Sequence, residues 1–261
     1  MRIIFVRHGE PDYTDDSLTE KGIKEANLLA KRAKDWKIKD IYVSPFGRAK
    51  QTAEPTVKVL GIQPEEKLWL REYSYMVTNP MHGKISVPWD FSPTQVHEDP
   101  KMSSIDEWVS AGPNISNSEV AKNYESVKNG IDEILEKYGY VRNANHYNRK
   151  DGRKRFIEST VKDMKYCAAD DLPNDDSEPT IMIVCHFGVI CLMLSHLLNI
   201  PFELLTHGFI LPTSSVTIVN TEERWSDEVS FRVQVMGDCT HLLTEGEKIS
   251  NAGSFARLFQ K

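Results

Sequence analysis

Residues 2–10 of the chain read RIIFVRHGE, and this stretch decides the fold prediction. Residues 2–6 are mostly β-branched or apolar, which is typical of a short strand buried in a sheet. A Gly-Glu-Pro run follows almost directly and ends the strand. Arg7 and His8 are therefore expected at the carboxyl end of the first strand, where open α/β sheets bind their ligands.

Strands and helices alternate in the sequence that follows. Apolar or small residues recur at helical spacing after Thr19, which we expect to cap a helix. Residues 41–43 predict a second buried strand, and residues 48–60 predict a second helix that ends at Gly61. Strand, helix, strand, helix in this order is typical of a parallel α/β sheet.

The same pattern returns towards the carboxyl end of the chain. Residues 181–185 predict a buried strand that ends just before His186, and residues 188–198 predict an almost wholly apolar helix. The stretches 215–220 and 229–235 have strand character and could add edge strands. We therefore predict an α/β fold, a three-layer α/β/α sandwich with a mostly parallel central sheet.

The regular alternation is interrupted between the two halves of this pattern. The interruption carries five prolines between residues 80 and 113, one clear helix at residues 118–138, and a turn signal at residues 150–152 between two possible hairpin strands. A polar run at residues 170–178 is expected to lead back to the core. We interpret the whole chain, residues 1–261, as a single domain in which residues 73–178 form an inserted cap.

Composition limits the partners that the protein can have. The 261-residue chain has a formal net charge of -6, whereas general nucleic-acid binding usually depends on a broad positive field. It has no run of about 18 to 20 apolar residues, and its first strand is too short for a signal peptide, so we expect a cytoplasmic protein that binds neither membranes nor nucleic acid. The four cysteines lack CxxC spacing, which favours free structural thiols over disulfides or a zinc site.

Basic side chains occur at predicted strand or helix ends in three separate segments. These are Arg7 with His8, then Arg48, and finally His186. Because ligands bind outside the carboxyl ends of strands, the three segments could converge on one site. Two guanidinium groups and two imidazoles would form a compact anion trap, to which helix amino termini add N–H groups.

The motifs around these residues resemble those of the histidine phosphatase (phosphoglycerate mutase-like) superfamily. Residues 7–9 read RHG, as at the end of that family's first strand. Residues 18–22 (LTEKG) resemble the opening of its first helix, residues 48–53 (RAKQTA) its second-arginine motif, and residues 185–188 (CHFG) its second-histidine segment. Four motifs in the family's order are far more specific than RHG alone. The resemblance covers the predicted core and leaves the insertion unexplained.

The resemblance implies a role for each matching residue. His8 would be the nucleophile that accepts the phosphoryl group, and Arg7, Arg48 and His186 would hold the phosphoryl oxygens. Phe187, which follows the second histidine, is a further candidate for substrate binding. This chemistry requires no cofactor and no metal ion.

The resemblance also implies an acidic residue that protonates the leaving group. Glu72 is the preferred candidate, because it follows the apolar segment 68–70 much as the family's acid follows its own. Glu10, which directly follows the RHG motif, is the competing carboxylate and a candidate for substrate binding. A solvated ion pair with Arg71 is the alternative for Glu72.

These residues predict a metal-independent phosphomonoester hydrolase of the histidine acid phosphatase type, which acts on a small phosphorylated substrate. A phosphoglycerate-type phosphomutase is the nearest alternative and would need extra basic residues, for which residues 149–155 are the candidate, although a solvated hairpin tip is their plainer interpretation. Thr14, a candidate substrate-binding residue, stands where mutase-like members usually have asparagine, which favours the phosphatase. A non-catalytic phosphate- or phosphopeptide-binding module is the third alternative. No particular oligomeric state is predicted.

Overall fold

The computed structural model describes residues 1–79, 81–112, 114, 117–151, 178–225, 227–254 and 256–260. Most of the predicted linker 170–178 and the last four residues of the basic run 149–155 lie outside these described residues.

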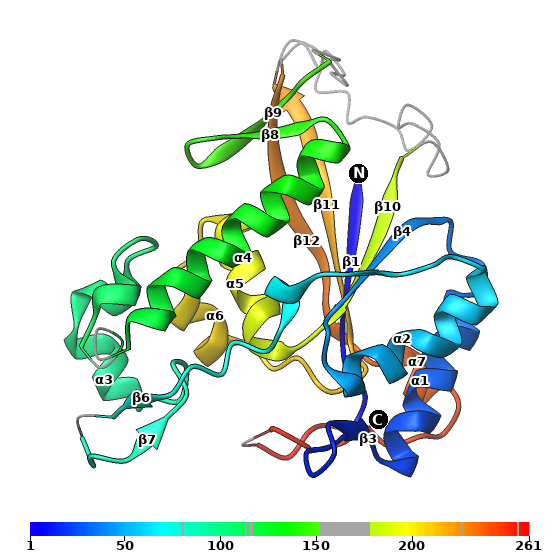
Figure 1. Cartoon of the computed structure of the whole chain (residues 1–261), viewed down its shortest axis with the longest axis horizontal. Helices are drawn as coiled ribbons and strands as arrows, with labels where there is room; N and C mark the ends of the chain where they lie inside the picture. The colour runs from blue at the N-terminus through cyan, green and yellow to red at the C-terminus, as the bar shows by residue number, and fades with distance from the viewer. Residues whose placement is uncertain are drawn as a thin grey trace, which may run out of the picture.

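A central sheet runs through the molecule (Figure 1). The order of its strands in space differs from their order in the sequence. In the described part of the chain it has eight strands, in the spatial order β5-β4-β10-β1-β11-β12-β9-β8. The bounds of these strands are β1 Arg2–Arg7, β4 Ile38–Val43, β5 Glu65–Glu66, β8 Tyr140–Asn143, β9 His146–Arg149, β10 Thr180–Cys185, β11 Val216–Trp225 and β12 Glu228–Asp238.

The α/β sandwich predicted from the sequence is confirmed, but its sheet is mixed rather than mostly parallel. The three pairings among β5, β4, β10 and β1 are parallel, and the four pairings from β1 through β11, β12 and β9 to β8 are antiparallel. The reason lies in the connections, because β8–β9 and β11–β12 are hairpins, and a hairpin can join only antiparallel strands. Strands β11 and β12 are interior strands, so their interpretation as edge strands is wrong.

Helices cover both faces of the sheet (Figure 1). One face carries α1 (Glu20–Ala33), α2 (Gly47–Leu60) and the short α7 (Thr240–Leu243), and the other carries α4 (Ser118–Lys137), α5 (Phe187–Leu198) and α6 (Phe202–Gly208). No helix in the described ranges has the length and apolar character that a membrane crossing requires.

Strand β1 is buried on both faces of the sheet, which explains why its residues are almost all apolar. Ile3 and Phe5 pack in the core under α4 and α5, whereas Ile4 and Val6 pack in a second core under α1 and α2. Side chains of a strand alternate between the two faces of a sheet, so a strand covered on both faces is apolar along its whole length.

The predicted caps of the first two helices are confirmed. The Thr19 hydroxyl accepts a hydrogen bond from the backbone N–H of Gly22, and Thr19 is the N-cap of α1. Helix α2 ends at Gly61, whose φ of 68° lies in the left-handed region that glycine adopts without strain.

The segment between β5 and α4 consists of short elements. They are the 3₁₀ helices η1 (Leu68–Leu70), η2 (Pro100–Ser103) and η3 (Trp108–Ser110), the helix α3 (Pro93–Glu98), and the two-stranded sheet of β6 (Val77–Thr78) and β7 (Ile85–Ser86). A second small sheet, of β2 (Pro11–Asp12) and β3 (Ser17–Leu18), follows β1.

The hairpin in the predicted insertion is present, but its turn lies earlier than the sequence suggested. Strands β8 and β9 pair from Tyr140 with Arg149 to Asn143 with His146, so the turn is formed by Ala144 and Asn145 rather than by residues 150–152. Ala144 has a φ of 50°, a value that its sequence neighbours do not signal. The hairpin also joins the central sheet through the pairing of β9 with β12.

Candidate active site

Two histidines meet at the carboxyl ends of adjacent parallel strands. Arg7, the last residue of β1, pairs in register with Cys185, the last residue of β10, so His8 and His186 leave the sheet side by side. Their ring centroids are 5.0 Å apart, with the rings tilted by 56°. The predicted convergence of these distant segments is confirmed.

Backbone groups fix His8 in one orientation. Its N–H donates to the carbonyl of Cys185 at 2.9 Å, and its carbonyl accepts from the N–H of Ser214 at 2.9 Å. The ring Nδ1 lies 2.8 Å from the carbonyl oxygen of Gly9. Because a carbonyl only accepts, Nδ1 carries the proton and Nε2 keeps its lone pair. Burial, assisted by the Arg7 guanidinium, lowers the pKa of His8 to about 3, so the ring is neutral at pH 7.

His186 is held by a serine that the sequence analysis did not single out. Its Nε2 lies 2.7 Å from Ser44 Oγ, and Ser44 Oγ also accepts a hydrogen bond from the N–H of Phe46 at 3.3 Å. The tautomer of the ring decides which of these two atoms donates, because the hydroxyl can both donate and accept. Nδ1 has no hydrogen-bond partner among the described residues. Burial, and next the neighbouring His8, hold the pKa of His186 well below its usual value.

The two arginines approach the histidines from different elements. Arg7 is only 6% exposed, and its Nη1 donates to the carbonyl of Leu211 at 2.6 Å. A side chain at Gly253 would place its Cβ 2.7 Å from Arg7 Nη2, so glycine leaves room for the guanidinium. Arg48, 8% exposed near the start of α2, lies over the ring of Phe46 with its guanidinium carbon 4.8 Å from the centroid.

Arg48 has an acidic partner that the sequence analysis also missed. One carboxylate oxygen of Asp16 accepts from Arg48 Nη1, and the other accepts from the N–H of Gly47 at 2.6 Å. Asp16 therefore occupies the amino terminus of α2, where backbone N–H groups attract negative charge. Its backbone is in the left-handed region, with a φ of 52°.

Glu72 lies in the same site and is held by two backbone N–H groups. Its Oε1 accepts from Tyr73 and from Gly188, each at 2.9 Å, which places the carboxyl group against the first turn of α5. Burial raises its pKa, and the charges of Arg7 and Arg48 act in the opposite direction. A Cβ at position 188 would lie 2.9 Å from Glu72 Oε1, so glycine is required for this approach.

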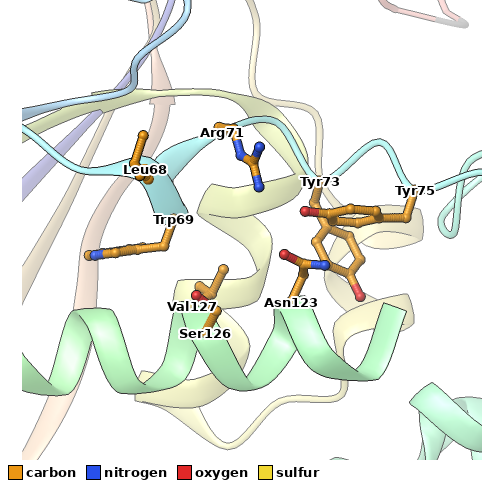
Figure 2. Close-up of a pocket in the computed structure, with 8 residues that line it drawn as sticks. All are labelled: Leu68, Trp69, Arg71, Tyr73, Tyr75, Asn123, Ser126 and Val127. Atoms are coloured by element: carbon orange, nitrogen blue, oxygen red, sulfur yellow. The ribbon is translucent and has the colours of Figure 1, made fainter. Parts of the chain in front are cut away.

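The ion pair of Glu72 with Arg71 is not found among the described residues. Arg71 instead lines a separate pocket of about 80 Å³ between η1 and α4. Figure 2 shows Arg71 beside Trp69, with Asn123 and Val127 of α4 facing them, and neither imidazole belongs to this pocket.

The side chains of Glu10 and Thr14 have surroundings different from those of the two histidines, the two arginines and Glu72. The Glu10 carboxylate accepts from Thr19 Oγ1 at 2.9 Å and from the Ser250 hydroxyl, which ties the loop after β1 to α1 and to the carboxyl-terminal segment. Thr14 lies exposed, and its N–H donates to Asp12 Oδ1 at 2.9 Å. Glu10 does not contribute to the pKa shift of His8 or of His186.

Close backbone packing explains why glycine occupies positions 9 and 22 in the motifs. A Cβ at Gly22 would lie 2.2 Å from the carbonyl oxygen of Glu10, and one at Gly9 would lie 2.8 Å from the carbonyl oxygen of Gly22. The N–H of Gly9 donates to Thr52 Oγ1 at 2.9 Å. The RHG, LTEKG and RAKQTA motifs are therefore in direct contact.

Glu25, buried beneath this contact, makes stability depend on pH. Its Oε2 accepts from the N–H of Glu10 at 2.8 Å, and burial raises its pKa from 4.5 to about 7. Between these values the unfolded chain releases a proton that the folded chain keeps, so stability falls as pH rises. We expect Glu25→Gln to be more stable than the native chain by about 3 kcal/mol at pH 8, with the difference vanishing below about pH 4.5.

Urea denaturation of both proteins across this pH range measures the difference. A difference that stays constant with pH would show that Glu25 is ionised in the folded protein. Glu20→Gln, on the exposed side of the first turn of α1, is the matched control.

Comparison with known proteins shows what this arrangement is similar to. Residues 3–107 match the family model of the histidine phosphatase superfamily, branch 1. The resemblance to the histidine phosphatase superfamily is thereby confirmed. Within the matched residues lie Arg7, His8, Arg48 and Glu72, and the fold adds His186 from outside them.

One curated relative and two solved structures show how far the similarity extends. A stretch of 72 residues is 36% identical to a Photorhabdus laumondii protein named probable phosphoglycerate mutase GpmB, and it spans 24% of this chain and 34% of that protein. A mycobacterial glucosyl-3-phosphoglycerate phosphatase superposes with a TM-score of 0.54 at 17% identity, over 90% of this chain and 97% of its own. A phosphoserine phosphatase from Entamoeba histolytica gives 0.54 at 16% identity, over 92% and 98%. At these identities the structures show a shared histidine phosphatase fold.

The predicted basic run does not reach the site in its described part. Arg149 pairs with Glu223 and Asp151, and Lys150 pairs with Glu136. Glu223 lies 3.9 Å from the amino group of Met1, at the end of β1 opposite to His8. Arg149 and Lys150 are therefore far from the two imidazoles.

Proposed function

We propose that the chain hydrolyses phosphomonoesters through a phosphohistidine on His8, without a metal ion. The observation that carries this proposal is the pair of buried, neutral imidazoles with ring centroids 5.0 Å apart, beside the two buried guanidinium groups of Arg7 and Arg48. A neutral imidazole with a free Nε2 lone pair is a competent nucleophile for phosphorus.

The surrounding residues have complementary roles in this reaction. Arg7 and Arg48 bind the phosphoryl oxygens. In the tautomer that carries its proton on the unpartnered Nδ1, His186 donates a third hydrogen bond to them. Glu72, whose pKa is raised by burial, protonates the leaving oxygen and then activates the water that releases phosphate. Phe187 lines the path that the rest of the substrate occupies.

The phosphomutase alternative has less support. It requires cations that hold a second phosphate, but Arg149 and Lys150 are paired at the other end of the sheet. Incubation with 3-phosphoglycerate and, separately, with an aryl phosphate distinguishes the two reactions. A mutase forms the 2-isomer of phosphoglycerate without net release of phosphate, whereas a hydrolase forms no isomer and releases phosphate from the aryl ester.

Turnover of a chromogenic aryl phosphate in the presence of a chelator tests the enzyme against a non-catalytic binding module. We expect saturable phosphate release that the chelator does not reduce. Binding of phosphate without turnover of any phosphomonoester would favour the module, and inhibition by the chelator would overturn the metal-independent mechanism.

Removal of Arg48 should weaken catalysis strongly while leaving the fold intact. We expect Arg48→Ala to lower kcat/KM by about 10²- to 10³-fold, because one preorganised donor to the phosphoryl group is lost. Lys50→Ala is the matched control, since Lys50 is exposed on the same helix and pairs with Glu66. Equal kcat/KM values for the two variants would contradict the role of Arg48.

The substrate is proposed to be a small phosphorylated molecule of the cytoplasm. Cys185, Cys191 and Cys239 are free thiols, which suits a reducing compartment.

A further inference from the structure

A cleft of about 340 Å³ opens from Arg7 and is the space into which a phosphomonoester must extend. Arg7 and Phe187 belong to both the cleft and the candidate active site. The other walls come from residues 89–91, from the end of α6 and the loop after it, and from the segment around Gly253. Its volume is in the range of small-molecule sites.

One wall of the cleft is a fixed aromatic surface. Trp89 packs edge-on against Phe187 and Phe202, with ring centroids 6.2 Å and 6.5 Å away, and stacks with Tyr73 at 6.5 Å. Each contact comes from a different element, so the indole plane is held in place before any ligand enters. A pre-formed aromatic surface binds flat apolar groups at little cost in conformational entropy.

A second part of the cleft lining exposes apolar side chains to water. Phe209 is 45% exposed and Ile210 is 49% exposed, and both line the cleft directly after α6. Exposed apolar groups gathered at one concave place are typical of a ligand site. Phe91, which is buried, completes the apolar lining.

The charges of the cleft disfavour an anionic leaving group. Among its described lining residues, Arg7 is the one permanent cation, and it belongs to the phosphoryl site. Burial, and next the nearby His97, lower the pKa of His207, so this imidazole is neutral at pH 7 although Asp90 acts in the opposite direction. Asp90 itself is an exposed carboxylate in the lining. A second carboxylate or phosphate on the substrate would meet repulsion there instead of a partner.

We propose that the preferred substrate is a phosphomonoester whose leaving group carries an uncharged aromatic or apolar ring, bound between Trp89 and Phe209. This inference rests on the proposed function and specifies its substrate class. Phosphoglycerate-like and phosphoserine-like compounds, which carry a carboxylate next to the ester, are poor substrates in this view.

Three alkyl phosphates with similar leaving-group basicity test the preference without changing the chemical step. They are propyl phosphate, 3-phenylpropyl phosphate and 3-carboxypropyl phosphate. We expect kcat/KM for the phenyl compound to exceed that for propyl phosphate by about 10- to 100-fold, from burial of one phenyl group. The carboxylate compound should fall below propyl phosphate.

Variants of the cleft connect this preference to its residues. Phe209→Ala, at the exposed rim, and Trp89→Ala should each lower the ratio of kcat/KM for the phenyl compound to kcat/KM for propyl phosphate by about 10-fold. Asp90→Asn should raise kcat/KM for the carboxylate compound alone. Leu68→Ala, which truncates an exposed apolar side chain in the pocket of Figure 2, is the matched control and should keep the native preference.

The outcomes separate this inference from the proposed function. Equal kcat/KM values for the three compounds, or a preference that survives Phe209→Ala and Trp89→Ala, would overturn the assignment of the cleft while hydrolysis stands. Absence of hydrolysis for all three compounds and for an aryl phosphate would overturn both.

Discussion

Replacement of His8 by alanine is expected to lower kcat by about 10⁴- to 10⁶-fold and to abolish the covalent phosphorylated intermediate. The reason is the geometry of its ring: Nδ1–H is held by the Gly9 carbonyl, so Nε2 is the atom that can attack phosphorus. Water is a weaker nucleophile for phosphorus than the imidazole that it would replace. The protein would be mixed with a substrate labelled on its phosphoryl group, and the reaction would be stopped rapidly without acid. Labelled phosphohistidine should be present in the native chain and absent from the variant.

Two further variants distinguish loss of the nucleophile from general damage to the site. His186→Ala removes a donor to the phosphoryl group, so it should slow turnover by about 10²- to 10³-fold yet still accumulate labelled protein. His82→Ala, in an exposed loop, should leave both readouts unchanged. Labelled protein in His8→Ala, or equal turnover in His8→Ala and the native chain, would eliminate His8 as the phosphoryl acceptor.

The residues that converge here were predictable because they follow apolar strands. The runs at residues 2–6 and 181–185 indicate buried strands, and a residue directly after such a strand must lie at the sheet edge. The sequence did not show which strands are neighbours. The structure shows that β1 and β10 are parallel neighbours, which brings His8 and His186 together. The pairing of Ser44 with His186 follows from the same logic, because Ser44 directly follows β4 on the other side of β10.

Other parts of the site depend on contacts that no periodicity encodes. Asp16 has a positive φ, which aspartate adopts more often than most residues, but its contacts with Arg48 and Gly47 join segments that are about 30 residues apart. The Leu211 carbonyl that fixes Arg7 belongs to an irregular stretch before β11. The turn of the β8–β9 hairpin was predicted too late in the chain for a related reason, since Ala144 and Asn145 lack the glycine or proline that usually indicates a turn.

The aromatic cleft illustrates the same limit for specificity. Trp89, Phe187 and Phe209 are far apart in the sequence and lie in different elements or loops. They become neighbours only when α5 and α6 pack against residues 73–112 in the folded structure. Strand ends therefore predict where the phosphoryl group binds, whereas the identity of the leaving group requires the folded structure.

Glu72→Gln is expected to separate substrates by the basicity of their leaving groups. We expect kcat/KM for alkyl phosphates to fall by about 10²- to 10⁴-fold, because an alkoxide cannot leave without a proton. For an aryl phosphate with a good leaving group, kcat/KM should fall less than about 10-fold, since this parameter reports only the steps up to its departure. Glu10→Gln is the matched control, because its carboxylate is bound to Thr19 and Ser250.

The pH dependence follows from the two shifted pKa values. His8, with a pKa of about 3, stays neutral throughout the ordinary range and would limit activity only near or below pH 3. Glu72 must be protonated to act as the acid, and burial raises its pKa, so kcat/KM for an alkyl phosphate should be highest on the acidic side of neutrality and decline as pH rises through that pKa. In Glu72→Gln this alkaline decline should disappear, because the amide does not titrate. A native rate that keeps rising above pH 8 would contradict Glu72 as the acid. A decline that survives in Glu72→Gln and disappears in Glu10→Gln would assign the proton to Glu10 instead.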